Sequence, residues 1–245
     1  MKRRTALAFL GIGALSGCGG GGSPAAAGSS ALPVGVQTPG ATSAEAAVST
    51  PSAPAAAVAS TAGGRSIACW GDSITNLYAP HLQAVFPGRQ VYNGGVVGET
   101  SAQINARELA DTAHKDWVSV FWYGHNDWFK DQVGANLAAS IAALAPGTPY
   151  VVMSILNWST DLPGTTQYNA VLQANAALAQ KYPNNFLDIR SLLVSWYDGS
   201  IAQDVIDHSN DETPSSLRFD TIHLNDKGCN LVAAKVGEFI TAKGW

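Results

Sequence analysis

Beyond residue 64 the sequence alternates short apolar runs with amphipathic helical stretches, and this alternation constrains its fold most strongly. The apolar runs are rich in β-branched and aromatic residues, as strands buried on both faces are. They cover residues 66–70, 90–92, 117–123, 150–156 and 185–189, and helical patterns cover 76–86, 102–114, 133–144, 166–181 and 226–243. Strands that alternate with helices form a parallel sheet with helices on both faces. The sequence therefore predicts an α/β fold, a three-layer α/β/α sandwich around a central five-stranded parallel sheet.

Composition divides the chain near residue 64. All seven Trp and all seven Tyr follow that residue, and so does every Phe except Phe9. Within residues 18–64 the only charged residue is Glu45. A segment of this kind cannot bury enough apolar surface to offset the entropy lost on ordering. We therefore expect residues 18–64 to be a disordered Gly/Ser/Ala/Pro tether, and residues 65–245 to form one folded domain.

Charge and hydropathy exclude several classes of protein. Charged residues make up 13% of the chain and the net charge is −4. No basic surface is available to neutralise phosphates, so we expect no nucleic-acid partner. No apolar run approaches the ~20 residues that a membrane-spanning helix needs. Three cysteines are too few for a small domain held together by disulfides.

The first residues have the pattern of an export signal. Basic residues at positions 2–4 precede the apolar stretch 6–15, and Cys18 ends the tetrapeptide Leu-Ser-Gly-Cys. This order resembles a bacterial lipoprotein signal peptide with its lipobox, and an ordinary signal peptide is the alternative. The resemblance implies that residues 1–17 are removed and that Cys18 is lipidated. The exported protein would then be lipid-anchored to the cell envelope, at the outer membrane or the periplasmic face, with Cys18 as its contact with the membrane.

Four polar blocks lie where predicted strands end or where the last helix begins. They are residues 71–75 (Gly-Asp-Ser-Ile-Thr), 93–100, 124–127 (Gly-His-Asn-Asp) and 220–223 (Asp-Thr-Ile-His). In parallel α/β sheets, sites form outside the carboxyl ends of the strands. We therefore expect these four blocks to meet at one edge of the sheet.

The blocks contain the residue types that nucleophilic catalysis needs. A serine hydroxyl requires a base to take its proton, and a histidine base is most effective when a carboxylate fixes its tautomer. The spacing of Asp220 and His223 allows the carboxylate to accept Nδ1–H while Nε2 faces outward, and the position of Ser73 at the end of a strand lets the fold bring it to His223. The sequence has no Gly-x-Ser-x-Gly, which excludes the nucleophile elbow of the α/β-hydrolases.

Gly-Asp-Ser, a mid-chain glycine, Gly-x-Asn-Asp and a late Asp-x-x-His, in this order, resemble the four blocks of the SGNH (GDSL-type) hydrolases. The resemblance extends over essentially all of residues 65–245. It implies a flavodoxin-like sandwich that hydrolyses esters and requires no metal or organic cofactor. It further implies that Ser73 is the nucleophile, His223 the base and Asp220 the group that orients it.

The same resemblance implies an oxyanion hole. Its donors would be the backbone N–H groups of Ser73 and Gly98 and the side-chain amide of Asn126. The remaining motif residues are Gly71, Asp72, Gly124 and Asp127, and we expect the two aspartates to brace their loops by hydrogen bonding.

Each block also has a purely structural interpretation. Ser73 could cap a helix that starts near Asn76, Asn126 and Asp127 could form a turn, and Gly98 could mark one. Asp220 could be an acid in a surface loop and His223 a histidine at a helix start. The coincidence of all four blocks at predicted strand ends favours catalysis.

Other residues carry weaker expectations. Trp128 and Trp158 are candidates for substrate binding, whereas Trp122 and Tyr123 are expected in the core. With His125, the third block reads Gly-His-Asn-Asp and resembles that of the rhamnogalacturonan acetylesterases. This resemblance favours acetyl esters of carbohydrates as substrates. The acidic run 204–212 is expected to be a solvated loop, with calcium binding as the alternative. Cys69 and Cys229 would be either two buried thiols or a disulfide.

The predicted protein is an extracytoplasmic serine esterase that acts on short-acyl esters such as O-acetyl groups on carbohydrate. Its partner would be an ester substrate, either a small molecule, a lipid or an acylated polysaccharide. An O-acetyltransferase, or a lysophospholipase or lipase, would use the same triad. If the protein is not an enzyme, the alternative is a non-catalytic, lipid-anchored module that binds carbohydrate.

Overall fold

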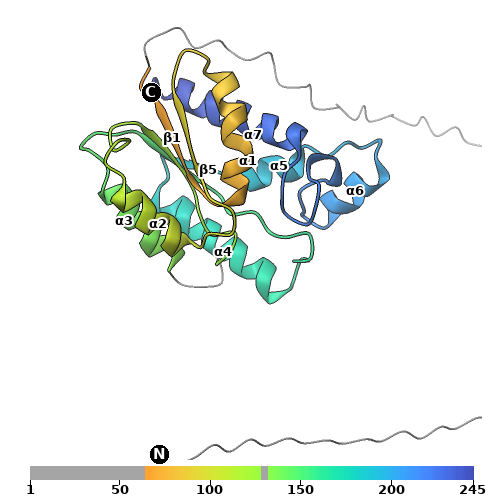
Figure 1. The fold of residues 1–245 in the computed structure, drawn as a ribbon. Coiled ribbons are helices and arrows are strands. Elements are labelled where there is room, and N and C mark those ends of the chain that lie inside the picture. Colours follow the sequence, from red (N-terminus) through yellow and green to blue (C-terminus); the bar gives the residue numbers. More distant parts are fainter. Residues whose placement is uncertain (1–63, 128–131) are drawn as a thin grey trace, which may run out of the picture. The chain divides into compact units, whose positions relative to one another are not determined.

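The computed structural model describes residues 64–127 and 132–245 (Figure 1). No helix in this part of the chain is long and apolar enough to cross a lipid bilayer. The predicted signal peptide, Cys18 and nearly all of the predicted tether lie outside the described residues, and so does Trp128.

Five strands form a single parallel sheet with the order β2-β1-β3-β4-β5. They are β1 (Ile67–Gly71), β2 (Val91–Gly95), β3 (Val118–Trp122), β4 (Tyr150–Met153) and β5 (Phe186–Leu187). Gly71 is in register with Gly95 on one side and with Trp122 on the other. The three strands therefore finish level, and the loops that follow them share one edge of the sheet.

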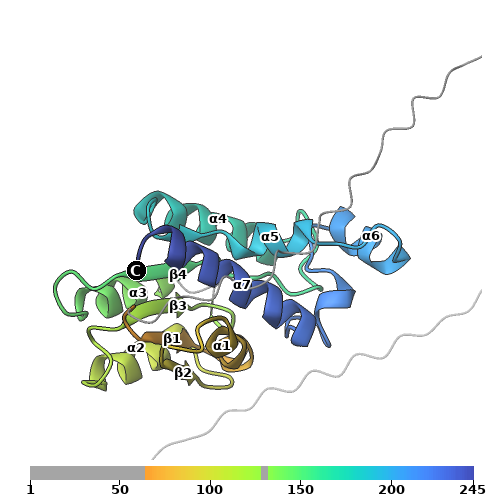
Figure 2. The same cartoon turned by 90° about the horizontal axis from the view of Figure 1, so that it is seen from above.

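Helices cover both faces of the sheet, as the sequence predicts (Figures 1 and 2). One face carries α1 (Ser73–Val85), α5 (Ile189–Ser195) and α7 (Asp226–Ala242), and the other carries α2 (Ser101–Ala110), α3 (Val133–Ala142) and α4 (Thr166–Lys181). A hydrophobic core lies on each face of the sheet, and alternate residues of each strand point into one core or the other. In β1, Ile67 and Cys69 face the first, whereas Ala68 and Trp70 face the second. The three-layer sandwich is confirmed.

Two helices are absent from the prediction. The expected strand 185–189 pairs over only two residues, because Asp188 caps α5 by accepting a hydrogen bond from Ser191 N at 3.2 Å. Helix α6 (Ala202–Ser209), followed by the 3₁₀ turn η1 (Ser215–Leu217), occupies most of the expected acidic loop.

The solvated-loop interpretation of residues 204–212 is wrong, because three of their carboxylates are buried. Asp204 accepts hydrogen bonds from Ser216 N and Oγ, and Asp207 accepts from Ser215 N and Oγ. Glu212 lies 4% exposed beside them. The inward carboxylates hold the η1 turn in place. Among the described residues, no group of three or more His, Cys, Asp or Glu side chains is placed to hold a metal ion.

The buried Asp207 makes stability depend on pH. Burial alone would raise the pKa of Asp207, but hydrogen bonds from Ser215 and Gln203 outweigh it and lower that pKa below its ordinary value. Stabilisation from a lowered pKa is present above the unfolded-state pKa of about 3.9 and is lost as pH falls through the folded value. We expect Asp207→Asn to cost about 1.5–3 kcal/mol at pH 7, because hydrogen bonds to a charged acceptor are lost.

Urea unfolding of the wild type and of Asp207→Asn between pH 7 and pH 3.5 measures this effect. The difference in the free energy of unfolding between the two proteins should become smaller below about pH 4. If Asp207→Asn were less stable than the wild type by the same free energy at every pH from 7 to 3.5, the lowered pKa of Asp207 would be contradicted.

Both described cysteines are free thiols, so Cys69 and Cys229 form no disulfide in this structure. Burial raises the pKa of each thiol to about 12. A thiol with so high a pKa stays protonated and unreactive at neutral pH, so both cysteines behave as core residues.

Candidate active site

Ser73 occupies the first position of helix α1, directly after strand β1. The structural alternative for Ser73, a helix cap, belongs instead to Asp72, whose Oδ1 accepts a hydrogen bond from Ile74 N at 3.0 Å. Helix α1 therefore begins at Ser73 rather than near Asn76. Because Asp72 satisfies the helix end, the Ser73 hydroxyl is available for another partner.

That partner is His223. Ser73 Oγ lies 2.8 Å from His223 Nε2, and His223 Nδ1 lies 2.7 Å from Asp220 Oδ2. With Nδ1–H donated to the carboxylate, Nε2 is left to accept the serine proton. The structure thus brings Ser73, His223 and Asp220 into one hydrogen-bonded line.

Asp220 also holds the backbone of its own loop. Its Oδ1 accepts hydrogen bonds from Ile222 N at 2.9 Å and from His223 N at 2.7 Å. Burial would raise the pKa of Asp220, but these bonds and the one from the His223 ring outweigh it and lower that pKa. The carboxylate therefore remains ionised at neutral pH, as an acceptor for Nδ1–H must.

The segment that carries Asp220 and His223 folds back on itself. Arg218 and Leu224 form an antiparallel bridge, and Phe219 N donates to His223 O at 3.0 Å. Arg218 Nη1 donates to Asp220 O at 2.9 Å, while its Nη2 lies 3.5 Å from Asp207 Oδ2. Arg218 therefore connects the buried Asp207 of α6 with the backbone of Asp220.

The predicted oxyanion donors lie just beyond the ends of β1, β2 and β3, Ser73 at the start of α1 and the other two in loops. Gly98 has a φ of +78°, a conformation that glycine adopts far more readily than other residues. Among the described residues, no protein acceptor takes the N–H of Ser73 or of Gly98. Asn126 Nδ2 donates to Glu99 O at 2.9 Å and lies 3.4 Å from Asp72 Oδ2. Its second amide proton thus has only a long contact within the protein.

The other motif residues fix these loops. Asp127 accepts hydrogen bonds from Ser101 N and, at 2.6 Å, from Ser101 Oγ, which ties the start of α2 to the loop after β3. Gly71 lies so close to β3 that a Cβ there would be 2.6 Å from Trp122 O. Gly124 has a φ of +108°.

The aromatic candidates separate into core and site. Trp122 and Tyr123 are buried in the core, as predicted. His125 is also buried, with Nδ1 lying 3.0 Å from Asp72 Oδ2. Trp158 is half-buried, and its indole N–H donates to His125 O at 3.4 Å. Of the two tryptophans expected to bind substrate, Trp158 therefore lies against the third block.

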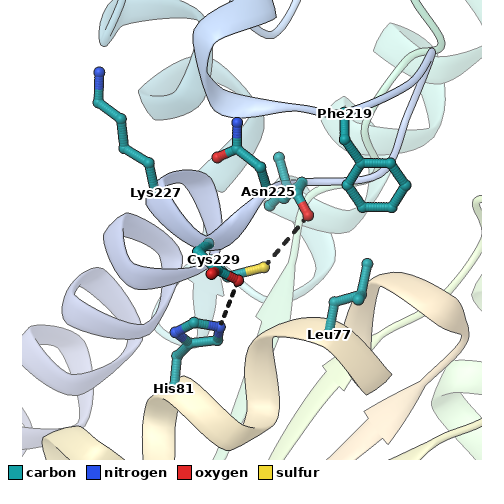
Figure 3. A pocket seen from close by; sticks show the side chains of 8 residues that line it. Leu77, His81, Phe219, Asn225, Lys227 and Cys229 are labelled. Carbon is teal, nitrogen blue, oxygen red and sulfur yellow. Dashed lines mark hydrogen bonds and ion pairs between the residues drawn. The ribbon is translucent and has the colours of Figure 1, made fainter.

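A groove of about 430 Å³ opens between α1 and α7, next to the segment that carries His223 (Figure 3). Its lining combines apolar and polar side chains: Leu77, His81, Phe219, Leu224, Asn225, Asp226, Lys227 and Cys229. Phe219 is 63% exposed and stacks on the His223 ring with centroids 5.6 Å apart. Leu77 follows Ser73 by about one helical turn, and neither Ser73 nor His223 lines the groove itself.

Sequence reasoning missed Phe219 and the groove. The only sequence signal for Phe219 is its position directly before Asp220, and a single aromatic residue there does not stand out as a pattern. The groove forms from α1 and α7, which are far apart in sequence.

Comparison with known proteins identifies the family and the fold. Residues 60–231 match the family model described as the GDSL-like lipase/acylhydrolase family. The fold resembles a lipase/acylhydrolase from Enterococcus faecalis, with 17% identity, a TM-score of 0.56, and coverage of 73% of this chain and 96% of that one. A catalytic mutant of an acetylxylan esterase from Geobacillus stearothermophilus shows 17% identity and a TM-score of 0.54, with 74% and 95% covered.

A curated relative is the tail spike protein of Salmonella phage epsilon15, which is 26% identical over 145 residues. The match covers 54% of this chain but only 14% of the phage protein. The solved structures establish the fold, and the family model establishes the kind of enzyme. The chain belongs to the GDSL-like lipase/acylhydrolase family and is a carboxylic ester hydrolase.

Proposed function

We propose that this protein is a serine esterase whose triad is Ser73, His223 and Asp220. The observation that carries the proposal is the unbroken line of hydrogen bonds, 2.8 Å from Ser73 Oγ to His223 Nε2 and 2.7 Å from His223 Nδ1 to Asp220 Oδ2. Those distances suit proton transfer from the serine to the histidine without rearrangement.

The reaction proceeds in two halves. Ser73 Oγ forms a bond to the ester carbonyl carbon while its proton passes to His223 Nε2. The carbonyl oxygen gains negative charge and is held by the N–H groups of Ser73 and Gly98 and by the Asn126 amide. Collapse of this intermediate breaks the bond to the alcohol, which leaves with the proton from His223.

Water then releases the acyl group by the same route. His223 takes a proton from the water as its oxygen attacks the acyl-enzyme, and returns that proton to Ser73 Oγ as the acid departs. Asp220 stays ionised throughout, fixing the tautomer of His223 and stabilising its protonated form.

We infer that the substrate is a short-acyl ester, such as an O-acetyl group on carbohydrate. Support comes from the aromatic side chains near the triad, since the exposed Phe219 and the half-buried Trp158 offer faces on which a sugar ring can stack. The polar rim of the groove, with His81 and Lys227, offers hydrogen bonds to hydroxyl groups. The apolar lining favours a second candidate, an esterase for longer acyl chains of the lysophospholipase or lipase type.

A series of p-nitrophenyl esters from acetate to palmitate separates the two candidates. We expect kcat/KM to be highest for acetate and to fall steeply with chain length. A maximum at long chains would overturn the short-acyl assignment and establish the lipase type. The same assay with an added sugar acceptor distinguishes hydrolysis from O-acetyl transfer, because transfer yields an acetylated sugar instead of free acetate.

We further propose that the enzyme works outside the cytoplasm, attached to the cell envelope by lipid on Cys18. Support comes from the basic start, the short apolar stretch and the Leu-Ser-Gly-Cys sequence. Incorporation of a labelled fatty acid that persists in Cys18→Ser would overturn this assignment.

A further inference from the structure

Glu99 connects two of the proposed oxyanion donors. It follows Gly98 directly in the chain, and its carbonyl oxygen accepts a hydrogen bond from Asn126 Nδ2 at 2.9 Å. A shift of Glu99 would therefore move the Gly98 N–H through the backbone and the Asn126 amide through the hydrogen bond.

The carboxylate of Glu99 is held by Arg107 of helix α2. Arg107 Nη2 lies 2.7 Å from Glu99 Oε2, and Arg107 Nε lies 3.3 Å from Oε1 and 3.2 Å from Oε2. Two guanidinium nitrogens thus bind one carboxylate, the arrangement that gives an arginine–carboxylate pair its fixed geometry. The side chains are only 27% and 17% exposed, so solvent screens the pair less than it screens a surface ion pair.

The same guanidinium binds the ends of two strands. Arg107 Nη2 donates to Gly94 O in β2 at 2.8 Å and lies 3.4 Å from Gly71 O, the last residue of β1. The guanidinium carbon also lies 5.5 Å from the Trp70 ring centroid. Gly71 is two residues before Ser73, so Arg107 directly links the segments that carry Ser73 and Gly98, and it reaches Asn126 through Glu99.

Apolar packing does not anchor this loop. Val96 and Val97, which precede Gly98, are 40% and 72% exposed. A glycine with exposed neighbours has little to fix its backbone, apart from the hydrogen bonds of Val96 N to Gly71 O and of Glu99 N to Val96 O. The ion pair is therefore a side-chain restraint on the Gly98 loop, alongside the Asn126 amide that donates to Glu99 O and the Asp127 carboxylate that binds Ser101.

We propose that Arg107 and Glu99 are positioning residues that hold the N–H of Gly98 and the amide of Asn126 in place for the developing oxyanion. This inference rests on the proposed triad mechanism. Neither residue touches the reacting atoms in this role. Their effect should appear in the stabilisation of tetrahedral species rather than in the binding of the planar ester.

The test compares Glu99→Gln and Arg107→Lys with Glu108→Gln. Glu108 is the control, because it lies on α2 next to Arg107 and its buried carboxylate also forms an ion pair, with Lys115 at 2.6 Å. Glu99→Gln removes the charge but keeps an acceptor, and Arg107→Lys keeps the charge but loses the two-pronged geometry. Each variant is assayed with p-nitrophenyl acetate, with active sites counted by a fluorophosphonate probe.

Removing one oxyanion donor outright typically costs 10²–10³-fold in kcat. We expect a smaller loss from misplaced donors, about 10- to 100-fold in kcat per active site for Glu99→Gln and Arg107→Lys, with KM within about twofold of the wild type. Inhibition by a boronic acid, which becomes tetrahedral on Ser73, should weaken by a similar factor. Glu108→Gln should retain wild-type kcat and boronate affinity.

The outcomes separate this inference from the proposed function. If Ser73→Ala is inactive but Glu99→Gln and Arg107→Lys keep wild-type kcat and boronate affinity, the positioning role is overturned and the triad stands. An equal loss in Glu108→Gln would also overturn it, because general destabilisation of α2 would explain the effect. An active Ser73→Ala would overturn the triad itself.

Discussion

Replacing Ser73 with alanine should lower kcat for p-nitrophenyl acetate by about 10⁴-fold or more and leave the fold intact. Loss of the nucleophile in a serine hydrolase leaves only the rate enhancement supplied by the oxyanion hole and substrate binding. The fold should survive because Asp72, and not Ser73, caps helix α1. The Ser73 hydroxyl forms a hydrogen bond with His223 and with no other described side chain.

Steady-state kinetics and thermal unfolding of the same preparations measure both effects. Ser195→Ala is the matched control, since it also removes a helical hydroxyl, one that donates to Leu192 O at 2.7 Å. The control should keep wild-type kcat. A folded Ser73→Ala that retains activity within tenfold of the wild type would show that another group attacks the ester.

The second large effect concerns Gly95, the last residue of β2. A Cβ at Gly95 would lie 2.5 Å from Asn76 Cα and 2.7 Å from Thr75 C, and closer still to Asn76 N. All three are backbone atoms of the first turn of α1, so no side-chain rotation relieves the overlap. We expect Gly95→Ala to destabilise the protein by about 3 kcal/mol or more, above the usual 1–3 kcal/mol of overpacking.

The same substitution should reduce the activity of the molecules that still fold, because pushing α1 away from β2 moves Ser73 away from His223. Urea unfolding and kcat per fluorophosphonate-reactive site provide the two readouts. Gly134→Ala, in α3, is the control, since a Cβ there meets nothing within 4 Å. An alanine in an open helical position should stabilise slightly. Equal stability of the Gly95→Ala and Gly134→Ala variants would contradict the close approach of β2 and α1.

The sheet and the helices that pack on it follow from sequence patterns alone. The strands of this domain are apolar on both sides, and α4 has the same bounds in the prediction and in the structure. The predicted helix 102–114 ends early at Ala110, because the Asp111 side chain accepts hydrogen bonds from the N–H groups of Ala113 and His114. A side chain that binds nearby backbone N–H groups in this way can end a helix, and the spacing of hydrophobic residues does not predict where that happens.

Helix α6 shows where periodicity misleads. Asp204 and Asp207 point inward, and their partners Ser215 and Ser216 come later in the chain. A rule that places charged residues at the surface cannot find them until the partners are known. The pair of Arg107 and Glu99 could not be predicted either, because no sequence motif identifies an ion pair at the end of a strand.

The site residues were found for a different reason. The blocks that contain Ser73, Gly98, Asn126, Asp220 and His223 belong to a family pattern, and the structure brings these residues to one edge of the sheet. Substrate recognition has no comparable pattern. The groove beside Phe219 depends on how α1 and α7 meet, which only the folded chain determines.

The pairing of Ser73 with His223 joins positions 150 residues apart. During synthesis, the serine and its cap are made early, while the histidine arrives just before α7, the helix that packs on α1. An unfinished or partly folded chain therefore carries a hydroxyl with no base beside it. With the proposed triad, the chain should gain esterase activity only once α7 has docked, so the appearance of that activity should report on completed folding.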